Sequence, residues 1–275
     1  MPAISAIIVT FNSGAVVGRA IESLGDVSEI VCVDNASDDK GHSVPRTGRT
    51  TLIRNTNNVG FGRACNQAAE VAHGEFLLFL NPDVRLQPGC LDALSQAIDR
   101  YADCGVFIPR TLTPDGAPWF RDRSRIEDWR RRGKRWRSAI AGDCCTGFVD
   151  GGIFLIRRDL FLEIGGFDEN IFLYHEDDDL SQRLAEAGQP MIVVAEAEAV
   201  HDLGHSSPQT LRNAFIRQQA KKHSEIYLKQ KYDIPYSSFS DGLIIASRLL
   251  YYTATLQARR AVGSAARLAA IAKAF

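Results

Sequence analysis

The sequence contains no CxxC pair, no internal repeat and no apolar run long enough to span a membrane. The six cysteines have no regular ligand spacing and several lie in apolar runs, which favours free thiols over a zinc site or a disulfide framework. The most apolar stretch near the C-terminus is interrupted by Arg248, and the opening residues lead directly into a strand-like run without a signal peptide. We therefore expect a protein that is made and kept in the cytoplasm.

Charge is distributed unevenly, although the net charge is only −1. From Pro208 onward there are eleven Lys and Arg and three Asp and Glu, so this tail carries about +8 and the first 207 residues about −9. A basic tail is either a solvated helical face or a surface that attracts an anionic membrane or a phosphate-bearing partner. The composition, 45% hydrophobic and 24% charged, is that of an ordinary globular protein, and we favour one α/β domain with a helical tail over two small domains.

Short β-branched apolar runs alternate with helical patterns along the chain. Strands are predicted at 6–10, 29–33, 51–54, 76–80, 153–156 and 193–200. Helices are predicted at 15–24, 62–72, 88–101, 159–164, 208–232 and 241–274, and the Arg- and Trp-rich run 122–137, which has no apolar period, is predicted to be a loop. The alternation predicts βαβ units, and hence an α/β fold whose mostly parallel sheet has helices on both faces.

In such a sheet, ligands collect at the carboxyl ends of the strands, so the polar residues there are the first site candidates. They are Thr10-Phe11-Asn12, Asp34 to Ser37 and Asn81-Pro82-Asp83. Asp83 follows a strand of pure hydrophobes, and a carboxylate on such a rigid support suits a hard divalent cation, although Asn-Pro-Asp also forms ordinary turns. His201 ends another predicted strand; alone it is an ordinary histidine, but paired with Asp83 it suggests a site that tolerates manganese.

Two further segments have the chemistry of a site. The acidic run Glu176 to Asp179 predicts a helix N-terminus, and repulsion between adjacent carboxylates raises the proton affinity of one of them, as a general base requires. Helix stabilisation or solubility is the alternative explanation. The loop from Asn57 to Arg63 places glycines and free amides at a predicted helix start, where they favour a diphosphate or form a plain helix start.

Seven segments in this order resemble the family 2 glycosyltransferases, in particular their bacterial rhamnosyltransferase-like branch. They are IVTFN (8–12), VDNASDD (33–39), NNVGFGRACNQ (57–67), FLNPDV (79–84), DGGIFLIRRDLF (150–161), GGFDENIFLYHEDDDLSQRL (165–184) and VH (200–201). The resemblance implies a GT-A fold with a Rossmann-like sheet. It implies a catalytic domain at 1–207, with a nucleotide-binding half to about residue 110 and an acceptor-binding half from 111, and a C-terminal helical extension at 208–275.

The resemblance also implies roles for individual positions. Thr10, Phe11, Asn12 and Asp34 would hold the nucleoside, with Asp34 on the pyrimidine base. Asn58, Gly60 and Asn66 resemble the segment beneath the ribose and diphosphate, and Asn81 of the Asn-Pro-Asp turn would also bind the donor. Gly151 and Gly152 resemble the loop that borders the donor sugar and the acceptor. Asp83 and His201 would bind Mn²⁺ or Mg²⁺, and Asp177, beside Glu176, would be the general base. Two departures stand out, because Asn81 replaces one carboxylate of the DxD-type motif and His175 stands where many relatives have an aromatic residue.

These parts imply an inverting transfer of a sugar, rhamnose by resemblance, from a dTDP- or UDP-linked donor to a glycan or lipid-linked acceptor in bacterial surface polysaccharide synthesis. Two rivals stay open. A sugar-phosphate nucleotidyltransferase would carry a basic Gly-rich loop after its first strand, whereas residues 10–14 include no Lys or Arg; a noncatalytic nucleotide-sugar binder would not need Glu176 and Asp177. No nucleic-acid partner is expected. The C-terminal helices either associate with the inner face of the plasma membrane, or pack on the domain or form a dimer. The second alternative is favoured for the segment before Tyr232.

Overall fold

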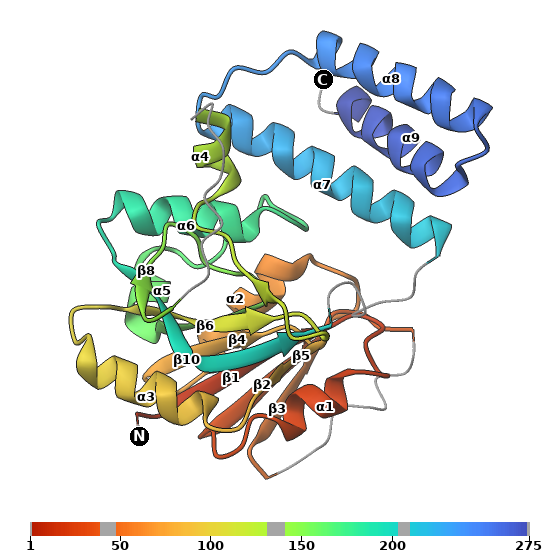
Figure 1. The fold of residues 1–275 in the computed structure, drawn as a ribbon. Helices are drawn as coiled ribbons and strands as arrows, with labels where there is room; N and C mark the ends of the chain where they lie inside the picture. Colours follow the sequence, from red (N-terminus) through yellow and green to blue (C-terminus); the bar gives the residue numbers. More distant parts are fainter. Residues whose placement is uncertain (1, 39–47, 131–140, 203–209, 274–275) are drawn as a thin grey trace.

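A mixed β-sheet forms the centre of the protein in the computed structural model, which describes residues 2–38, 48–130, 141–202 and 210–273 (Figure 1). Four strands at one side are parallel to one another: β3 (Thr50–Arg54), β2 (Glu29–Asp34), β1 (Ile4–Thr10) and β4 (Phe76–Leu80). These strands agree with the predicted ones to within two residues. All residues of β1 and β4 are buried, as expected for parallel strands that are covered on both faces.

The other side of the sheet adds strands of both directions. β9 (Ile153–Arg157) lies antiparallel between β4 and β6 (Val106–Leu112), and β10 (Met191–His201) runs parallel to β6. The short β5 (Val84–Leu86) pairs antiparallel with the end of β10 and closes this edge. β7 (Pro118–Trp119) pairs with β6, and β8 (Cys144–Cys145) pairs with β10. The prediction of a mostly parallel sheet is confirmed, with β9 inside the sheet and β5 at its edge as the main antiparallel strands.

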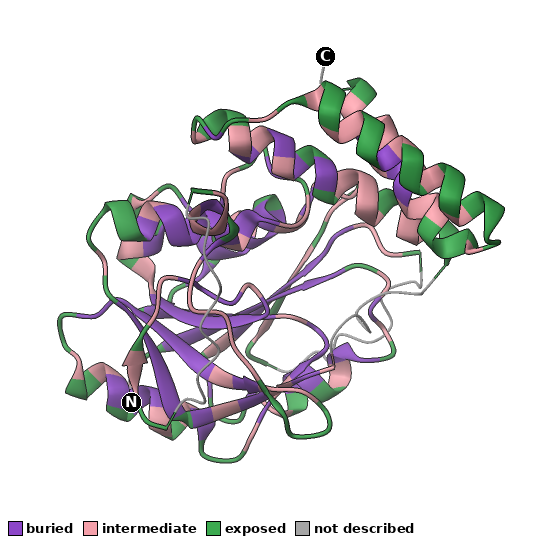
Figure 2. Ribbon diagram, turned by 45° about the horizontal axis from the view of Figure 1, so that its top comes forward, coloured by how far each residue is buried: buried purple, intermediate pink, exposed green. Residues whose placement is uncertain are grey.

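Helices cover both faces of the sheet, as predicted. α1 (Val17–Glu22) and α3 (Cys90–Arg100) bury their apolar residues against one face, and α2 (Phe61–Val71), α5 (Arg158–Glu163) and α6 (Glu176–Glu186) lie against the other. Figure 2 shows the resulting buried sheet with partly exposed helices around it. All six cysteines are free thiols, and four of them are buried in this core.

Three helices complete the chain above the α6 side of the sheet (Figure 1). They are α7 (Leu211–Lys231), α8 (Ser238–Ala254) and α9 (Ala258–Lys273). The prediction of one helix over 241–274 is wrong, because the chain turns at 255–257, where Leu256 has a φ of 56°. The turn lets the small buried residues Ala266 and Ala270 of α9 pack inside the helical layer, which one straight helix would leave exposed. In the described ranges, no helix has both the length and the hydropathy to cross a bilayer.

The predicted loop at 122–137 is also partly wrong, because Arg125–Arg130 forms helix α4. Ile126 of α4 is fully buried in a small cluster with Ile171 and with Leu228 of α7. Ile126 and Trp129 are too few to give a periodic signal, so this helix depends on tertiary contacts that the sequence pattern did not reveal. Residues 131–137 of the predicted loop, and the predicted domain boundary at 207, lie outside the described residues.

Candidate active site

Asp83 and His201 meet because the strands next to them pair. β5 begins directly after Asp83 and runs antiparallel to the end of β10, so that Val84 lies opposite His201. The N–H of Asp202 donates to the Asp83 carbonyl at 2.9 Å, and Nε2 of His201 lies 3.4 Å from Oδ1 of Asp83. Both side chains are buried. Two residues far apart in the sequence are thus joined by ordinary sheet pairing.

This pair has buried polar atoms that lack partners. Neither carboxylate oxygen of Asp83 nor Nδ1 of His201 has a hydrogen-bond partner among the described residues. Burial disfavours the charged imidazole, but Asp83, Asp150 and Asp202 outweigh burial and raise the pKa of His201. Orphaned carboxylate oxygens beside an imidazole in a negatively charged environment fit a divalent cation. No cluster of three or more His, Cys, Asp or Glu that could hold a metal occurs in the described ranges, so the protein part of such a site would be this pair.

Two glycines connect the pair to the acidic helix. A Cβ added to Gly152 would lie 2.7 Å from Cε1 of His201, and a Cβ added to Gly151 would lie 3.0 Å from Cβ of Asp177. The backbone N–H of Asn81 donates to the Gly152 carbonyl at 2.9 Å, which fixes the Asn-Pro-Asp turn against this loop. Asp83, His201 and Asp177 are therefore linked by a chain of direct contacts through Gly152 and Gly151. Only glycine permits such close approach of the backbone to both side chains.

The acidic run begins α6, as predicted, and its four carboxylates have different surroundings. Asp179 is fully buried and accepts hydrogen bonds from Arg183 at 2.8 Å, Lys231 at 2.6 Å and Tyr232 at 2.8 Å. Glu176 is buried, and its Oε2 has no hydrogen-bond partner among the described residues. Asp177 alone of the four is partly exposed. Its Oδ1 accepts the Asp178 N–H at 2.9 Å, while Oδ2 is directed toward Gly151.

The carboxyl groups of this run differ in pKa for physical reasons. Burial, together with the charge of Asp178, raises the pKa of Asp177 to about 7. Burial and the neighbouring Asp177 raise the pKa of Glu176 to about 8. Burial also acts on Asp178, but hydrogen bonding to His175 and the charge of Arg121 outweigh it and hold the pKa of Asp178 below its usual value. At neutral pH, Asp177 is thus the partly exposed carboxyl of the run that is poised between its two protonation states.

Asp178 connects α6 to the segment that follows β7. Its Oδ1 accepts from Arg121 at 2.7 Å and from the Arg125 N–H at 2.6 Å, and its Oδ2 lies 2.7 Å from Nδ1 of His175. His175 and Tyr174 both have left-handed backbone conformations, with φ of 70° and 66°. Such backbone is strained in residues other than glycine, and it persists here at the start of α6, next to Asp177.

The residues predicted to hold the nucleoside also lie together, at the C-terminal ends of β1 and β2. Thr10 and Asp34 are opposite each other in the β1–β2 ladder. Oδ1 of Asp34 accepts the Ser37 N–H at 3.0 Å, Ser37 Oγ accepts the Asn12 N–H at 2.9 Å, and Oδ1 of Asn12 accepts the Asp38 N–H at 2.7 Å. Phe11 of the same turn is 37% exposed. These loops are therefore one hydrogen-bonded unit at the ends of β1 and β2.

Asn58, Gly60 and Asn66, which the resemblance places beneath the ribose and diphosphate, already make close contacts within the protein. Asn66 donates to the Phe167 carbonyl and accepts the Phe167 N–H, both at 2.9 Å. Gly60 has a φ of 97°, and a Cβ there would lie 2.6 Å from the Phe172 carbonyl oxygen. Oδ1 of Asn58 accepts from the side chain of Asn35 at 2.9 Å. This geometry favours a role in holding the 167–172 loop, which leads into α6, over direct contact with a nucleotide.

Two residues of the site were missed from the sequence, and a third, Asn35, was among the strand-end candidates without a predicted role. Asn35 is buried and bonds Asn58, Gly60 and Val59, which ties the end of β2 to the start of α2. Asp150 accepts from Thr111 at 3.1 Å and from the Gly152 N–H at 3.0 Å, and burial raises the pKa of Asp150. It directly precedes the two glycines, and this position was the available signal. Asn35 follows Asp34 at a strand end, but nothing in the sequence marked it as a hub.

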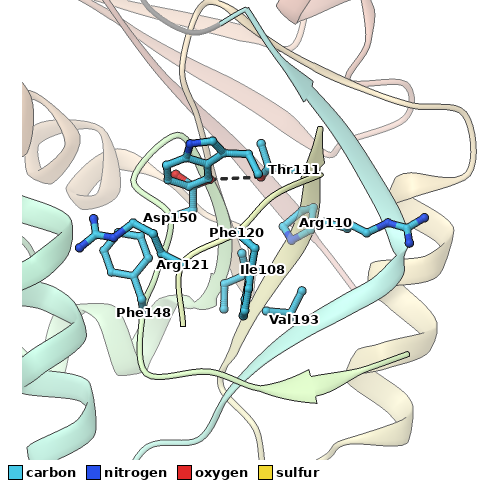
Figure 3. Close-up of a pocket in the computed structure, with 10 residues that line it drawn as sticks. Ile108, Arg110, Thr111, Phe120, Arg121, Phe148, Asp150 and Val193 are labelled. Atoms are coloured by element: carbon cyan, nitrogen blue, oxygen red, sulfur yellow. Dashed lines mark hydrogen bonds between the residues drawn. The ribbon is translucent and has the colours of Figure 1, made fainter. Parts of the chain in front are cut away.

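Arg121 is the second missed residue, and it borders a cavity next to Asp150 (Figure 3). Its guanidinium lies 3.7 Å from the centre of the Phe148 ring while it pairs with Asp178. The cavity is lined by Ile108, Pro109, Arg110, Thr111, Trp119, Phe120, Arg121, Phe148, Asp150 and Val193. It does not include Asp83, His201 or Asp177, so the candidate site is defined by the chain of contacts and not by this cavity.

Comparison with known proteins identifies the family. The profile described as Glycosyl transferase family 2 matches residues 5–165. The chain belongs to this family. N-acetylglucosaminyl-diphospho-decaprenol L-rhamnosyltransferase of Mycobacterium tuberculosis is 30% identical over 234 residues, covering 72% of this chain and 76% of the relative. The predicted family and its rhamnosyltransferase branch are confirmed.

Solved structures extend the likeness of this family 2 glycosyltransferase to the whole chain. The mannosyltransferase PcManGT from Pyrobaculum calidifontis, in complex with GDP-Man and Mn²⁺, has a TM-score of 0.56 and 18% identity, covering 100% of this chain and 76% of its own. TarS of S. aureus has a TM-score of 0.58 and 14% identity, covering 99% and 91%. At these identities the likeness shows the fold alone, and it confirms the predicted GT-A fold.

Proposed function

We propose that this glycosyltransferase transfers a sugar with inversion, from a dTDP- or UDP-linked donor to a hydroxyl of a glycan or lipid-linked acceptor. Rhamnose is the proposed sugar, and bacterial surface polysaccharide synthesis is the proposed process. The observation that carries the proposal is the chain of contacts from Asp83 and His201 through Gly152 and Gly151 to Asp177. A cation site next to a proton acceptor is what a displacement at a sugar carbon requires.

Asp177 is the proposed general base. Its Oδ1 is held by the Asp178 N–H, so Oδ2, which is directed toward Gly151, is the atom that would accept the proton of the acceptor hydroxyl. A pKa raised to about 7 makes this carboxyl a stronger base than an ordinary aspartate and still leaves much of it ionised at neutral pH. Glu176 would remain largely protonated at that pH, since its pKa is about 8, and would support Asp177 from the interior. Direct attack of the acceptor oxygen inverts the anomeric carbon.

Asp83 and His201 are the proposed holders of a divalent cation, Mn²⁺ or Mg²⁺. The support is their buried, unpartnered oxygen and nitrogen atoms and the Mn²⁺ in the PcManGT complex. When bound, the ion would neutralise the negative charge on the departing diphosphate. With two protein ligands, most of its coordination would come from phosphate oxygens and water, as is usual for Mg²⁺ in such sites.

The donor is proposed to lie along the sheet edge with its nucleoside at Thr10, Phe11, Asn12 and Asp34. Asn58, Gly60, Asn66 and Asn81 would shape the diphosphate part of the site, the first three through the loops that they hold. The name of the M. tuberculosis relative supports rhamnose and a lipid-diphosphate acceptor. The proposed division is a catalytic domain at 1–207, with halves at about 1–110 and 111–207, and a helical extension at 208–275. A lipid-linked acceptor would place the protein at the inner face of the plasma membrane.

Two variants test the assignment of the site. Asp177→Asn is expected to bind donor and Mn²⁺ like the wild type while turnover falls by about 10³-fold, because the base is lost but the donor site is intact. Asp83→Ala is expected to lose the metal-dependent part of donor affinity as well. Donor affinity by calorimetry and turnover with a panel of nucleotide sugars measure both. Glu163→Gln, an exposed carboxylate of α5, is the matched control. Full turnover in Asp177→Asn would end the assignment.

The rival functions have their own signatures in the same assays. A sugar-phosphate nucleotidyltransferase would release pyrophosphate from a nucleoside triphosphate and a sugar phosphate. A noncatalytic binder would be stabilised by a nucleotide sugar without ever consuming it. Transfer to an acceptor, with nucleoside diphosphate released, distinguishes the proposed activity from both.

A further inference from the structure

Helix α8 exposes large apolar side chains along one face. Phe239, Leu243, Ile244, Leu250 and Tyr251 are all exposed, and Phe239 and Leu250 are 77% and 73% accessible. Their spacing of four and seven residues places them on one side of the helix. The opposite side faces the neighbouring helices and includes the buried Ile245. Leu256, at the turn into α9, is 90% exposed and adds one more apolar side chain at the tip of the hairpin.

Basic residues lie in and just beyond α8, and carboxylates are nearly absent from the hairpin. Between Ser238 and Lys273 there are four Arg and one Lys, against the single acid Asp241. Asp241 is already paired with Lys222 and accepts from the hydroxyl of Tyr236. Arg248, in the middle of α8, and Arg259 and Arg260, just past its exposed tip, are exposed. An apolar face with basic residues at its border is the pattern of a helix that lies in a membrane interface.

Three lysines of α7 are paired with carboxylates of the protein itself. Lys229 and Lys222 pair with Glu225 in the same helix, and Lys231 pairs with Asp168 and Asp179 of the catalytic part. The charge of these three lysines is therefore balanced inside the protein. The α8–α9 hairpin, with five basic residues and one acidic residue, carries an excess of positive charge.

We propose that α8 lies in the interface of an anionic phospholipid bilayer, with Phe239, Leu243 and Leu250 among the acyl chains and the exposed arginines among the headgroups. The inference rests on the proposed function, since a lipid-linked acceptor must be met at a membrane. The tip of the hairpin lies at the same end of the molecule as the C-terminal ends of the parallel strands, on the right in Figure 1. A second copy of the chain is a poorer occupant, because a symmetric contact through α8 would bring the arginines of both copies together.

Vesicle sedimentation of the full chain, without donor or acceptor, tests the surface. We expect binding to vesicles of phosphatidylglycerol and phosphatidylcholine at low salt, weaker binding at high salt, and little binding to phosphatidylcholine alone. Leu243→Asp with Leu250→Asp should weaken binding by roughly tenfold or more, because charged groups replace the buried apolar face. Leu162→Asp with Val71→Asp, two exposed apolar residues far from α8 in the sequence, is the matched control.

A second pair of variants separates the two forces. Arg248→Gln with Arg260→Gln should remove most of the salt-sensitive part and leave residual binding through the apolar face. Equal vesicle binding by the Leu243/Leu250 variant and its control would overturn the proposal. So would light scattering that shows a dimer abolished by Leu243→Asp and Leu250→Asp, without vesicle binding by the wild type. Turnover on a soluble acceptor analogue should be unchanged in these variants, so a failure of membrane binding and a failure of the proposed transfer give different results.

Discussion

Four successive carboxylates at the start of α6 show how strongly surroundings decide the chemistry of a residue. Asp179 is neutralised by Arg183 and Lys231, and Asp178 by Arg121. Asp177 has no cation in direct contact among the described residues and is partly exposed, so it keeps a carboxyl that can gain and lose a proton. The side chains are nearly the same, and the difference lies in which neighbours the fold supplies.

The raised pKa of Asp177 gives a pH dependence for turnover. Because the base acts in its ionised form and its pKa is about 7, kcat/KM is expected to rise about tenfold per pH unit below that value and to level off above it. The measurement is the pH profile of transfer at saturating Mn²⁺. A profile that is flat from about pH 5.5 to about pH 8 would contradict the assignment.

The raised pKa of Asp177 also makes the stability of the protein fall as the pH rises. The pKa of Asp177 is raised in the folded protein from 3.8 to about 7, so the stabilising contribution is full below pH 3.8 and is lost as the pH rises through 7. Asp177→Asn avoids that loss. Its thermal midpoint is therefore expected to exceed that of the wild type at about pH 8, with the difference closing toward about pH 5.

At the scale of elements, hydrogen bonds to Asp178 connect the segment between β7 and α4 to α6. Arg121 and the Arg125 N–H both bind one carboxylate oxygen, and the ring of Phe148 lies under the guanidinium of Arg121. The ion pair is nearly shielded from solvent, with Asp178 2% and Arg121 15% accessible at their side chains. This contact holds the strained start of α6 in place, and with it the position of Asp177.

Breaking this contact should be costly. Arg121→Ala leaves a buried carboxylate without its cation and is expected to destabilise the protein by about 3 kcal/mol at neutral pH. Arg100→Ala is the control, because Arg100 also pairs with an aspartate, Asp143, but is 54% exposed; this variant should be clearly less destabilised than Arg121→Ala. Urea unfolding measures both. Equal costs for the two variants would show that the Arg121 pair has no special role.

Elements with long regular patterns were predicted well, and elements that depend on contacts were not. β4 is a run of five hydrophobes and is found where it was predicted. α4 has one buried apolar residue, Ile126, and its signal lies in what it touches on α7. The turn at Leu256 is likewise invisible in sequence, because 241–274 contains no proline or run of glycines to mark an end.

At the scale of the whole molecule, α7 joins the C-terminal helices to the catalytic part. Lys231 reaches Asp168 and Asp179, each at 2.6 Å, and the hydroxyls of Tyr227 and Tyr232 donate to the same two carboxylates at 2.8 Å. Ser224 Oγ donates to the Leu173 carbonyl at 3.0 Å. The packing alternative favoured for the segment before Tyr232 is thus what the structure has. Helix α7 therefore packs on α6, which contains Asp177, and on the loop that precedes α6.

Loss of Lys231 should loosen this junction. Lys231→Ala is expected to lower the free energy of unfolding by about 2 kcal/mol, because Asp168 and Asp179 both lose a charged hydrogen-bond donor. Hydrogen exchange should speed up more across α7 than in the catalytic core. Lys273→Ala, an exposed lysine at the end of α9, is the control and should leave both unchanged. Hydrogen exchange that is the same in the two variants would mean that α7 is held by its apolar contacts alone.

Acid should weaken the same junction. Burial acts to raise the pKa of Asp168, but Lys231, Asn170 and Tyr227 outweigh it and lower the pKa to about 2. The contribution of this carboxylate to stability is therefore present above its unfolded pKa of 3.8 and is lost as the pH falls through about 2.

By itself, the sequence determined the class of fold, because alternating strand and helix patterns and the hydrophobic β4 are local properties that survive in any context. It also determined the residue types at the strand ends. Only the tertiary structure decided which of them meet: the pairing of β5 with β10 brings Asp83 to His201, and the glycines at 151 and 152 let the backbone approach both His201 and Asp177. Contacts between distant segments carry no local signal, so the partner of each polar side chain, and with it the pKa of each carboxyl, is fixed only by the folded chain.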